Sequence, residues 1–300
     1  MKRTVAVLTL ILLLGLAFLL HRSPSVGTPR RSSPSEPAVD APPPEPAPVV
    51  VAVEPPKASE PPPPPRPPVR PPSRPPEPAA PVDIPGSAIV RGRVTVLGPP
   101  PPRKRIKMSV DPKCEALHAG SVLADTLVVG QDGGLRWAFV YIAQGINNQP
   151  PKRLLPPVLL DQVGCVYEPH VLGVQVGQPL NVFNNDALLH NVHALPFDNL
   201  EFNFGLPTRG LFKTVTFDTP EVMVRIGCDV HPWMKAWVGV LDHPYFAVTS
   251  DTGSYGIPSL PPGRYTIKVW HEAYATSTRE VDVPAGGDIS LDFIMDARRQ

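Results

Sequence analysis

Apolar and polar residues alternate in short runs over most of the chain beyond residue 86. Successive side chains of a strand lie on opposite faces, so this period of two indicates strands. Turn signals rich in Gly and Pro, such as Gln131–Gly134 and Pro261–Gly263, separate these runs. Many short strands between such turns predict an all-β fold built from β-sandwiches. We expect helix only as one short turn near Asp111–His118. The clearest alternating runs are 92–96, 174–176, 213–217 and 265–269.

The N-terminal residues follow another pattern. Lys2 and Arg3 precede an uncharged, mostly apolar run from Val5 to Leu20. A charged segment before a short apolar one is typical of an export signal. The run is close to the lower limit of roughly 17–25 residues that a membrane-spanning helix needs. No small-x-small cleavage motif follows it. We therefore expect an exported protein, periplasmic or at the cell surface. Residues 1–22 are expected to be a signal anchor, of which residues 5–20 tether the protein to the inner membrane, with a cleaved signal peptide as the alternative.

Residues 23–86 hold 25 of the 45 prolines of the chain. Such a segment cannot continue a helix or a sheet ladder, and it has little to bury. We predict a disordered, proline-rich linker that extends the reach of the folded part, with a docking ligand for a proline-binding module as the alternative. Its charges nearly cancel, and the whole chain carries a net charge of +1. This balance argues against nucleic acid as a partner.

Residues with metal-binding chemistry gather in the stretch 228–234, Cys-Asp-Val-His-Pro-Trp-Met. It offers a thiol, an imidazole and a thioether, and the upstream stretch 184–193 offers His190 as a second imidazole. A Cys and two His in a trigonal set with a weak axial Met form the ligands of an electron-transfer copper site. Zinc is the alternative, although it would require a second Cys or His pair near Cys228. We predict one mononuclear type 1 copper site with the ligands His190, Cys228, His231 and Met234.

Residues from about 157 to 241 resemble a cupredoxin, and the two ligand stretches are most similar to those of amicyanin, with plastocyanin next. The family pattern is N-x-x-x-x-P-H-N, followed further along by C-x-x-H with a Met close behind. Residues 184–191 and 228–234 fit this pattern, with Leu189 in the place of the family's Pro. The resemblance implies that His190, Cys228 and His231 are equatorial ligands and that Met234 is axial. It also implies that Asn191 ties the two ligand loops together and that His231 presents an exposed edge through which electrons pass.

A second resemblance covers the C-terminal part. The stretches Asp251–Tyr255 and Leu260–Tyr265 are similar to the hairpins of carboxypeptidase-regulatory, transthyretin-like sandwiches, in which the tyrosines face the core. Gly92–Val94 and Ala138–Ile142 fit the opening strands of that family. We therefore expect a split sandwich from residues 87–149 and 245–300, with a cupredoxin-like Greek-key copper domain, residues 150–244, inserted between its halves.

The remaining cysteines and histidines are assigned structural roles. Cys114 and Cys165 suit a disulfide in an exported protein, which leaves Cys228 as the thiolate ligand. His170 and His193 are expected to be structural, with an approach to the metal site as the alternative for each. His243 and His271 are expected to satisfy local hydrogen bonds. The basic stretch Arg103–Lys107 is expected to be a solvated loop, or else a docking patch for an acidic redox partner.

These features together predict a function in single-electron transfer between redox partner proteins, which the sequence does not identify. We expect no enzymatic activity, because the sequence contains no His-x-His pair for further copper sites, no Cys-x3-Cys, no Cys-x-x-Cys-His and no P-loop. Two alternatives remain open. One is a copper-binding or chaperone protein without redox turnover, and the other is a structural cell-surface module.

Overall fold

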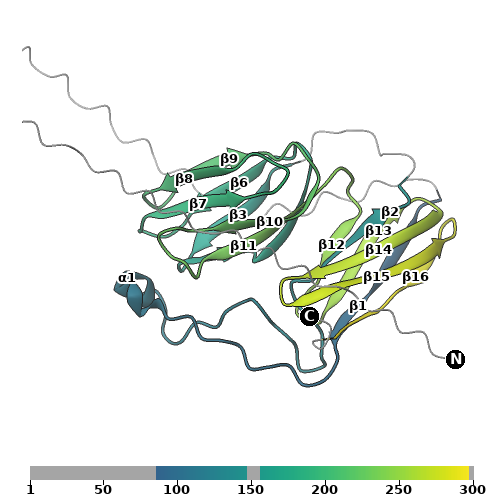
Figure 1. Ribbon diagram of the computed structural model, residues 1–300, viewed down its shortest axis with the longest axis horizontal. Helices are drawn as coiled ribbons and strands as arrows, with labels where there is room; N and C mark the ends of the chain where they lie inside the picture. The colour runs from purple at the N-terminus through teal and green to yellow at the C-terminus, as the bar shows by residue number, and fades with distance from the viewer. Residues whose placement is uncertain (1–85, 147–155, 297–300) are drawn as a thin grey trace, which may run out of the picture. The chain divides into compact units, whose positions relative to one another are not determined.

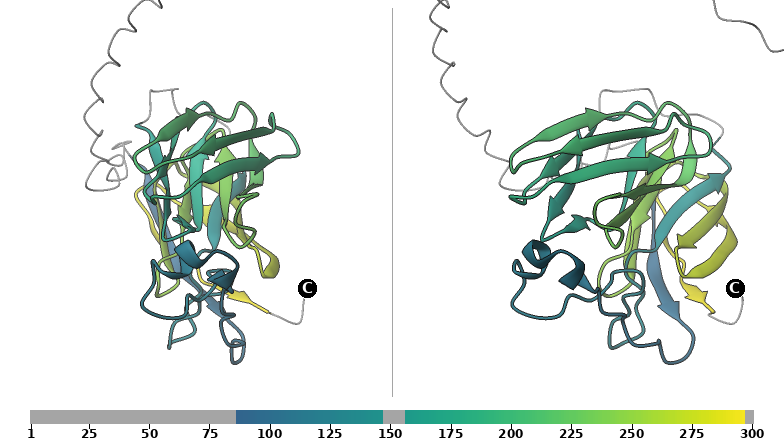
Figure 2. Two further views of the ribbon diagram at one scale, coloured as in Figure 1. Left: turned by 90° about the vertical axis from the view of Figure 1, so that its left-hand side faces the viewer. Right: turned by 60° about the vertical axis from the view of Figure 1, so that its left-hand side comes forward.

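The computed structural model describes residues 86–146 and 156–296. Within these residues the fold is all-β, as predicted (Figures 1 and 2). The expected helical turn is present as the 3-10 helix η1 (Met108–Val110) and the α-helix α1 (Pro112–Glu115). The predictions for residues 1–22 and 23–85 lie outside the described residues. In the described part of the chain no helix is long and apolar enough to cross a membrane.

The strands between residues 158 and 241 pair only with one another, within the described residues, and form two sheets. One sheet has the order β5-β11-β10-β7-β8, and the other has the order β4-β3-β6-β9. The pairs β3–β6 and β5–β11 are parallel, and the other pairs are antiparallel. The strands are β3 (Val158–Val163), β4 (Val166–Glu168), β5 (Val171–Gln175), β6 (Leu180–Asn184), β7 (His190–Leu195), β8 (Phe202–Leu206), β9 (Phe212–Val215), β10 (Glu221–Gly227) and β11 (Lys235–Leu241).

The core between these two sheets consists of the residues that face inward, which alternate along each strand with residues that face solvent. Along β10, for example, Val224 and Ile226 are buried while Arg225 between them is exposed. Burial of such side chains contributes roughly 1.5–3 kcal/mol each. Cys228 and Met234 belong to the same buried cluster as these residues, so the predicted ligand stretch is built into one end of this core.

The other strands form a second sandwich. One sheet has the order β13-β1-β16 with β17 also paired to β1, and the other has the order β12-β2-β14-β15. Its core includes Tyr255 and Tyr265, the tyrosines that were predicted to face inward. The strands are β1 (Ala88–Val96), β2 (Phe139–Gln144), β12 (Phe246–Val248), β13 (Ser254–Leu260), β14 (Gly263–His271), β15 (Tyr274–Val283), β16 (Asp288–Ser290) and β17 (Phe293–Met295).

The strands of this second sandwich come from before and after the first sandwich in the sequence. β1 pairs with β13, so that Val90 lies opposite Ile257, and β2 pairs with β14. The strands that were expected to open the transthyretin-like part therefore lie beside those that were expected to close it. The domain boundaries at 150 and 244 stay a prediction, since residues 147–155 are outside the described part of the chain.

Apolar contacts join the two sandwiches at an interface that depends on two glycines. The Phe139 ring packs against β11 at Gly239, and the Phe246 ring packs against β5 at Gly173. A Cβ atom at Gly239 would lie 2.4 Å from Phe139 Cζ, and one at Gly173 would lie 2.2 Å from Phe246 Cε2. The absence of a side chain at these two positions is what lets the aromatic rings reach the sheet surface.

A buried polar group lies at the same interface. The Glu272 carboxylate accepts a hydrogen bond from Lys235 Nζ at 2.7 Å and contacts His170 Nε2. Burial alone would raise the pKa of Glu272, but the bonds to His170 and Lys235 outweigh burial and lower the pKa to about 2. Lys235 directly follows Met234, so this ion pair fixes the start of β11 next to the predicted ligand stretch.

The neighbouring His271 provides a test of this buried region. Its pKa falls to about 4, because burial disfavours the imidazolium. Ala273 N–H donates to Nδ1 at 3.1 Å, and protonation of Nδ1 would break that bond. In the unfolded chain His271 binds a proton below about pH 6.5, whereas in the native chain it does so only near pH 4. The contribution of His271 to the free energy of unfolding is therefore fully present above pH 6.5 and is lost as the pH falls toward 4. The loss should amount to about 3 kcal/mol.

We therefore expect chemical denaturation between pH 7 and pH 4 to show a falling free energy of unfolding. The variant His271→Gln should lose part of this slope. The control His193→Gln should not weaken the slope, because bonds to Asp229 and Glu201 raise the pKa of His193 and its contribution to stability therefore has the opposite sign. An unchanged slope in His271→Gln would contradict the assignment.

Candidate metal centre

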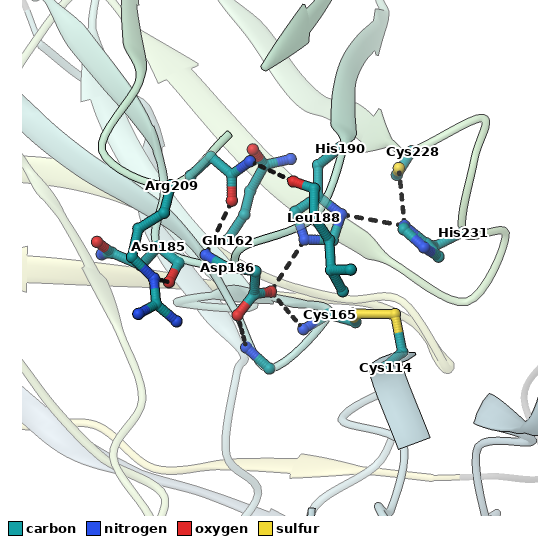
Figure 3. Close-up of polar contacts among 12 residues, drawn as sticks. Cys114, Gln162, Cys165, Asn185, Asp186, Leu188, His190, Arg209, Cys228 and His231 are labelled. Atoms are coloured by element: carbon teal, nitrogen blue, oxygen red, sulfur yellow. Dashed lines mark hydrogen bonds and ion pairs between the residues drawn. A yellow bond between two sulfur atoms is a disulfide. The ribbon is translucent and has the colours of Figure 1, made fainter. Parts of the chain in front are cut away.

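The stretch 228–234 forms a tight turn between β10 and β11 (Figure 3). The Cys228 N–H donates to the Met234 carbonyl at 3.3 Å, and the Met234 N–H donates to the His231 carbonyl at 2.9 Å. Pro232 further restricts the backbone of the turn. The three predicted ligands on this turn are all buried, with exposed fractions of 3% for Cys228, 1% for His231 and 1% for Met234.

His190 is the first residue of β7 and is fully buried. The loop before it is held by the Asn184 side chain, whose Nδ2 donates to the carbonyls of Leu188 at 2.8 Å and Leu206 at 2.7 Å. Asn184 Oδ1 accepts from the Asp186 N–H at 2.9 Å. The side chain of Asn184 thus fixes the position of His190 relative to β8.

Three of the four predicted ligands converge. His190 Nδ1 lies 3.0 Å from His231 Nδ1, and Cys228 Sγ lies 3.7 Å from the same His231 nitrogen (Figure 3). One donor atom from each of these residues lies within 4.8 Å of the other two. A thiol and two imidazoles at such spacing fit a soft transition-metal ion. Met234 is buried on the same turn, and its role as an axial ligand stays a prediction.

The outer edge of each imidazole is occupied by a carboxylate. His190 Nε2 lies 2.9 Å from Asp186 Oδ2, and His231 Nε2 lies 3.2 Å from Asp111 Oδ2. A carboxylate on one ring nitrogen fixes the ring orientation and leaves the other nitrogen for a metal. Both rings are therefore oriented with Nδ1 toward Cys228 and toward each other.

The charges of the centre are coupled. Burial would lower the pKa of His190, but its bonds to Asp186 and Cys228 outweigh burial and raise the pKa to about 9. Burial would likewise raise the pKa of the Cys228 thiol, but the bond to His190 and the nearby backbone N–H groups outweigh burial and lower it. Burial, together with the nearby His190 charge, lowers the pKa of His231. The site thus favours a thiolate at Cys228.

The two ligand loops are joined by Asn191, as the resemblance implied. Asn191 Oδ1 accepts from the Asp229 N–H at 2.6 Å, and Asn191 Nδ2 donates to Asp229 Oδ2 at 2.9 Å. Because Asn191 follows His190 and Asp229 follows Cys228, these two bonds fix the predicted ligand of one loop against those of the other.

The expectation that His231 presents an exposed edge is wrong. A segment from the connection between β1 and β2, residues 108–118, covers it; we call this segment the cap. Asp111 of the cap meets His231 Nε2, and Met108 is buried in the same cluster as Met234. The sequence places the cap more than a hundred residues before His231, so no local pattern could reveal this contact.

The predicted disulfide between Cys114 and Cys165 is present, and it attaches the cap to the turn between β3 and β4. Of the three cysteines, which all lie in the described residues, Cys228 is the free one. The Asp186 carboxylate accepts from the backbone N–H groups of Gly164 at 2.8 Å and Cys165 at 2.7 Å. Asp186 therefore links His190 to one end of the disulfide, as Asp111 links His231 to the helix that carries the other end.

The other histidines lie outside this group. His193 is partly exposed and contacts Glu201 and Asp229, and His170 contacts Glu272 at the interface between the sandwiches. Asp111 and Asp186 were not identified from the sequence as functional residues. For Asp186 the available signal was its position four residues before His190, whereas Asp111 gave none.

Comparison with known proteins supports the sequence resemblance of the C-terminal part. Residues 235–296 match the carboxypeptidase regulatory-like domain. This match extends from β11 through β17. A curated relative, rhamnogalacturonate lyase A of Aspergillus niger, is 36% identical over 61 residues, which is 20% of this chain. The chain spans only 12% of the length of that lyase.

Solved structures similar to this chain include cupredoxins, the other family that the sequence resembles. A purple cupredoxin from Nitrosopumilus maritimus is 21% identical, with a TM-score of 0.24, over 27% of this chain and 97% of its own. A Cu(I) structure of an amicyanin variant is 22% identical, with a TM-score of 0.26, over 34% of this chain and 97% of its own. A copper-containing nitrite reductase from Thermus scotoductus is 24% identical, with a TM-score of 0.26, over 33% of this chain and 25% of its own.

The cysteine arrangement can be tested without metal. In denaturant without reductant, we expect one thiol per chain to react with a thiol-specific reagent, because only Cys228 is free. After reduction three thiols should react. The variant Cys228→Ala should give none before reduction and two afterwards. Reaction of a second thiol in the unreduced wild type would contradict the Cys114–Cys165 bond.

Proposed function

We propose that the protein is an exported, membrane-tethered copper protein that carries single electrons between redox partner proteins. His190, Cys228 and His231 would hold the ion, with Met234 as a weak axial ligand. The observation that carries the proposal is the convergence of a buried thiol and two imidazole Nδ1 atoms within 4.8 Å. Copper in such a set supplies a one-electron couple between Cu(I) and Cu(II).

The protein contributes rigidity to this function. Electron transfer is fast only when the ligands rearrange little between the two oxidation states. Here the carboxylates of Asp186 and Asp111 hold the two rings, and the bonds between Asn191 and Asp229 hold the two loops together. The ligands are buried, which excludes water from the centre. A fixed donor set suits an electron carrier better than a protein that must release its ion.

A redox partner would approach the centre beside the cap. Leu189 and Val230 directly precede the ligands His190 and His231 in the sequence, and they are 49% and 46% exposed. A protein that docks on these apolar side chains comes within one residue of both imidazoles. We therefore place the electron-exchange surface at Leu189 and Val230, in place of the His231 edge.

The rival functions make different demands on the same residues. A copper chaperone would bind Cu(I) and pass it on without redox cycling. A structural surface module would not need the Cys228 thiol at all. We do not expect enzymatic turnover, because the sequence contains no His-x-His pair that would mark a further copper site.

The proposal is tested by the visible absorption spectrum of the full chain after addition of Cu(II). We expect an intense thiolate-to-copper charge-transfer band that is absent in Cys228→Ala. The band should persist in His193→Ala, a matched control in which a nearby histidine outside the donor group is removed. Met234→Leu should keep the band and change the reduction potential.

A pale spectrum that Cys228→Ala leaves unchanged would overturn the proposal. Reversible voltammetry without loss of metal separates an electron carrier from a chaperone, which would release the ion on cycling.

A further inference from the structure

The disulfide lies directly beside the metal centre. The sulfur atoms of Cys114 and Cys165 and one ring nitrogen of His231 all lie within 4.8 Å of one another, and all three residues are buried (Figure 3). The sulfur of Cys165 is equally close to donor atoms of Asp186 and His190. Nothing in the proposed electron-carrier function requires two further sulfur atoms at this place.

We propose that reduction of the Cys114–Cys165 disulfide creates a second soft-metal site, in which the two thiolates and His231 bind Cu(I). A dithiol supplies two electrons and two protons: its own sulfurs become a disulfide, the S–S bond breaks, and Cys114 and Cys165 become thiols. Binding of Cu(I) then releases both protons as the two thiolates coordinate the ion. When the first site is also filled, both nitrogens of His231 serve as donors, so the ring releases its remaining proton as well. Thiolate ligands select Cu(I) over harder ions.

Contacts other than the S–S bond hold the two sulfurs in place. Cys165 is fixed by its N–H bond to Asp186 at 2.7 Å and by the Trp233 Nε1–H bond to its carbonyl at 2.9 Å. The cap is fixed by His118 Nε2, which lies 2.8 Å from the Gly164 carbonyl oxygen. These bonds survive reduction, so the two thiols remain opposed rather than separating.

His231 has a nitrogen for each site. Its Nδ1 faces His190 and Cys228, while its Nε2 faces Asp111 in the cap, next to the helix that carries Cys114. A carboxylate that bonds to an imidazole nitrogen can give way to a metal ion at that nitrogen, so Asp111 marks the edge available to the second ion. The second site shares His231 with the proposed type 1 centre but uses neither Cys228 nor His190, so Cys228→Ala removes a ligand of the first site only.

The experiment counts Cu(I) ions bound by the full chain in competition with a Cu(I) chelator, before and after reduction by a phosphine that is then removed. The wild type should bind one ion when oxidised and two when reduced. Cys228→Ala should bind none when oxidised and one when reduced. The double variant Cys114→Ser/Cys165→Ser should bind one ion under both conditions.

Two results would overturn the proposal. One is a reduced wild type that binds no more Cu(I) than the oxidised form. The other is an extra ion in the reduced double variant, which would place the second site elsewhere. Failure of the type 1 centre gives a different pattern: the oxidised wild type binds nothing, while reduced Cys228→Ala still binds one ion. Circular dichroism of each variant confirms that the fold is retained.

Discussion

The hydrogen bonds on the outer edges of two buried imidazoles govern the arrangement of the centre. A buried ring nitrogen without a partner costs free energy, and a ring with one nitrogen bonded can offer only the other. Asp186 takes the outer edge of His190 and Asp111 takes that of His231. The two inner nitrogens must then meet Cys228 and each other. The two carboxylates thus determine that the Nδ1 atoms of the imidazoles face the site, whether or not an ion is bound.

The two carboxylates come from parts of the chain that belong to different sandwiches. Asp186 lies in the loop between β6 and β7, whereas Asp111 lies in the connection between β1 and β2. The split sandwich therefore contributes a side chain to the centre as well as a scaffold. Its Glu272 also holds Lys235, the residue after Met234, and its Phe139 ring packs on β11. The ligand turn is supported from the neighbouring sandwich at both of these points.

Much of this organisation was predictable from the sequence, because the determining patterns are local. Alternation along runs such as 265–269 predicted strands, and the turn glycines and tyrosines near 253–265 predicted the regulatory-like hairpins. Cys228, His231 and Met234 lie on one short loop, so their proximity follows from spacing alone. The contact of Asn191 was predicted correctly, since it joins the residues that follow two predicted ligands, His190 and Cys228.

What could not be predicted depends on contacts between distant segments. The burial of His231 results from the cap, which reaches it across more than a hundred residues of chain. The disulfide partners were inferred from the expected export of the chain, yet their position beside the donor group has no signature in the sequence. The interface glycines at 173 and 239 lie within strands, where only the neighbouring aromatic rings explain them.

The nested order of the strands has a consequence for biosynthesis. β1 is made early, but its partners β13, β16 and β17 are made only with the last part of the chain. The strands from β3 to β11 are complete well before that, so the first sandwich can fold while β1 still lacks these three partner strands. The early-made cap must then find its disulfide partner on an already folded surface. Every residue of the cap and of the donor group precedes β11 in the sequence, so the centre can assemble before the strands that complete the second sandwich are made.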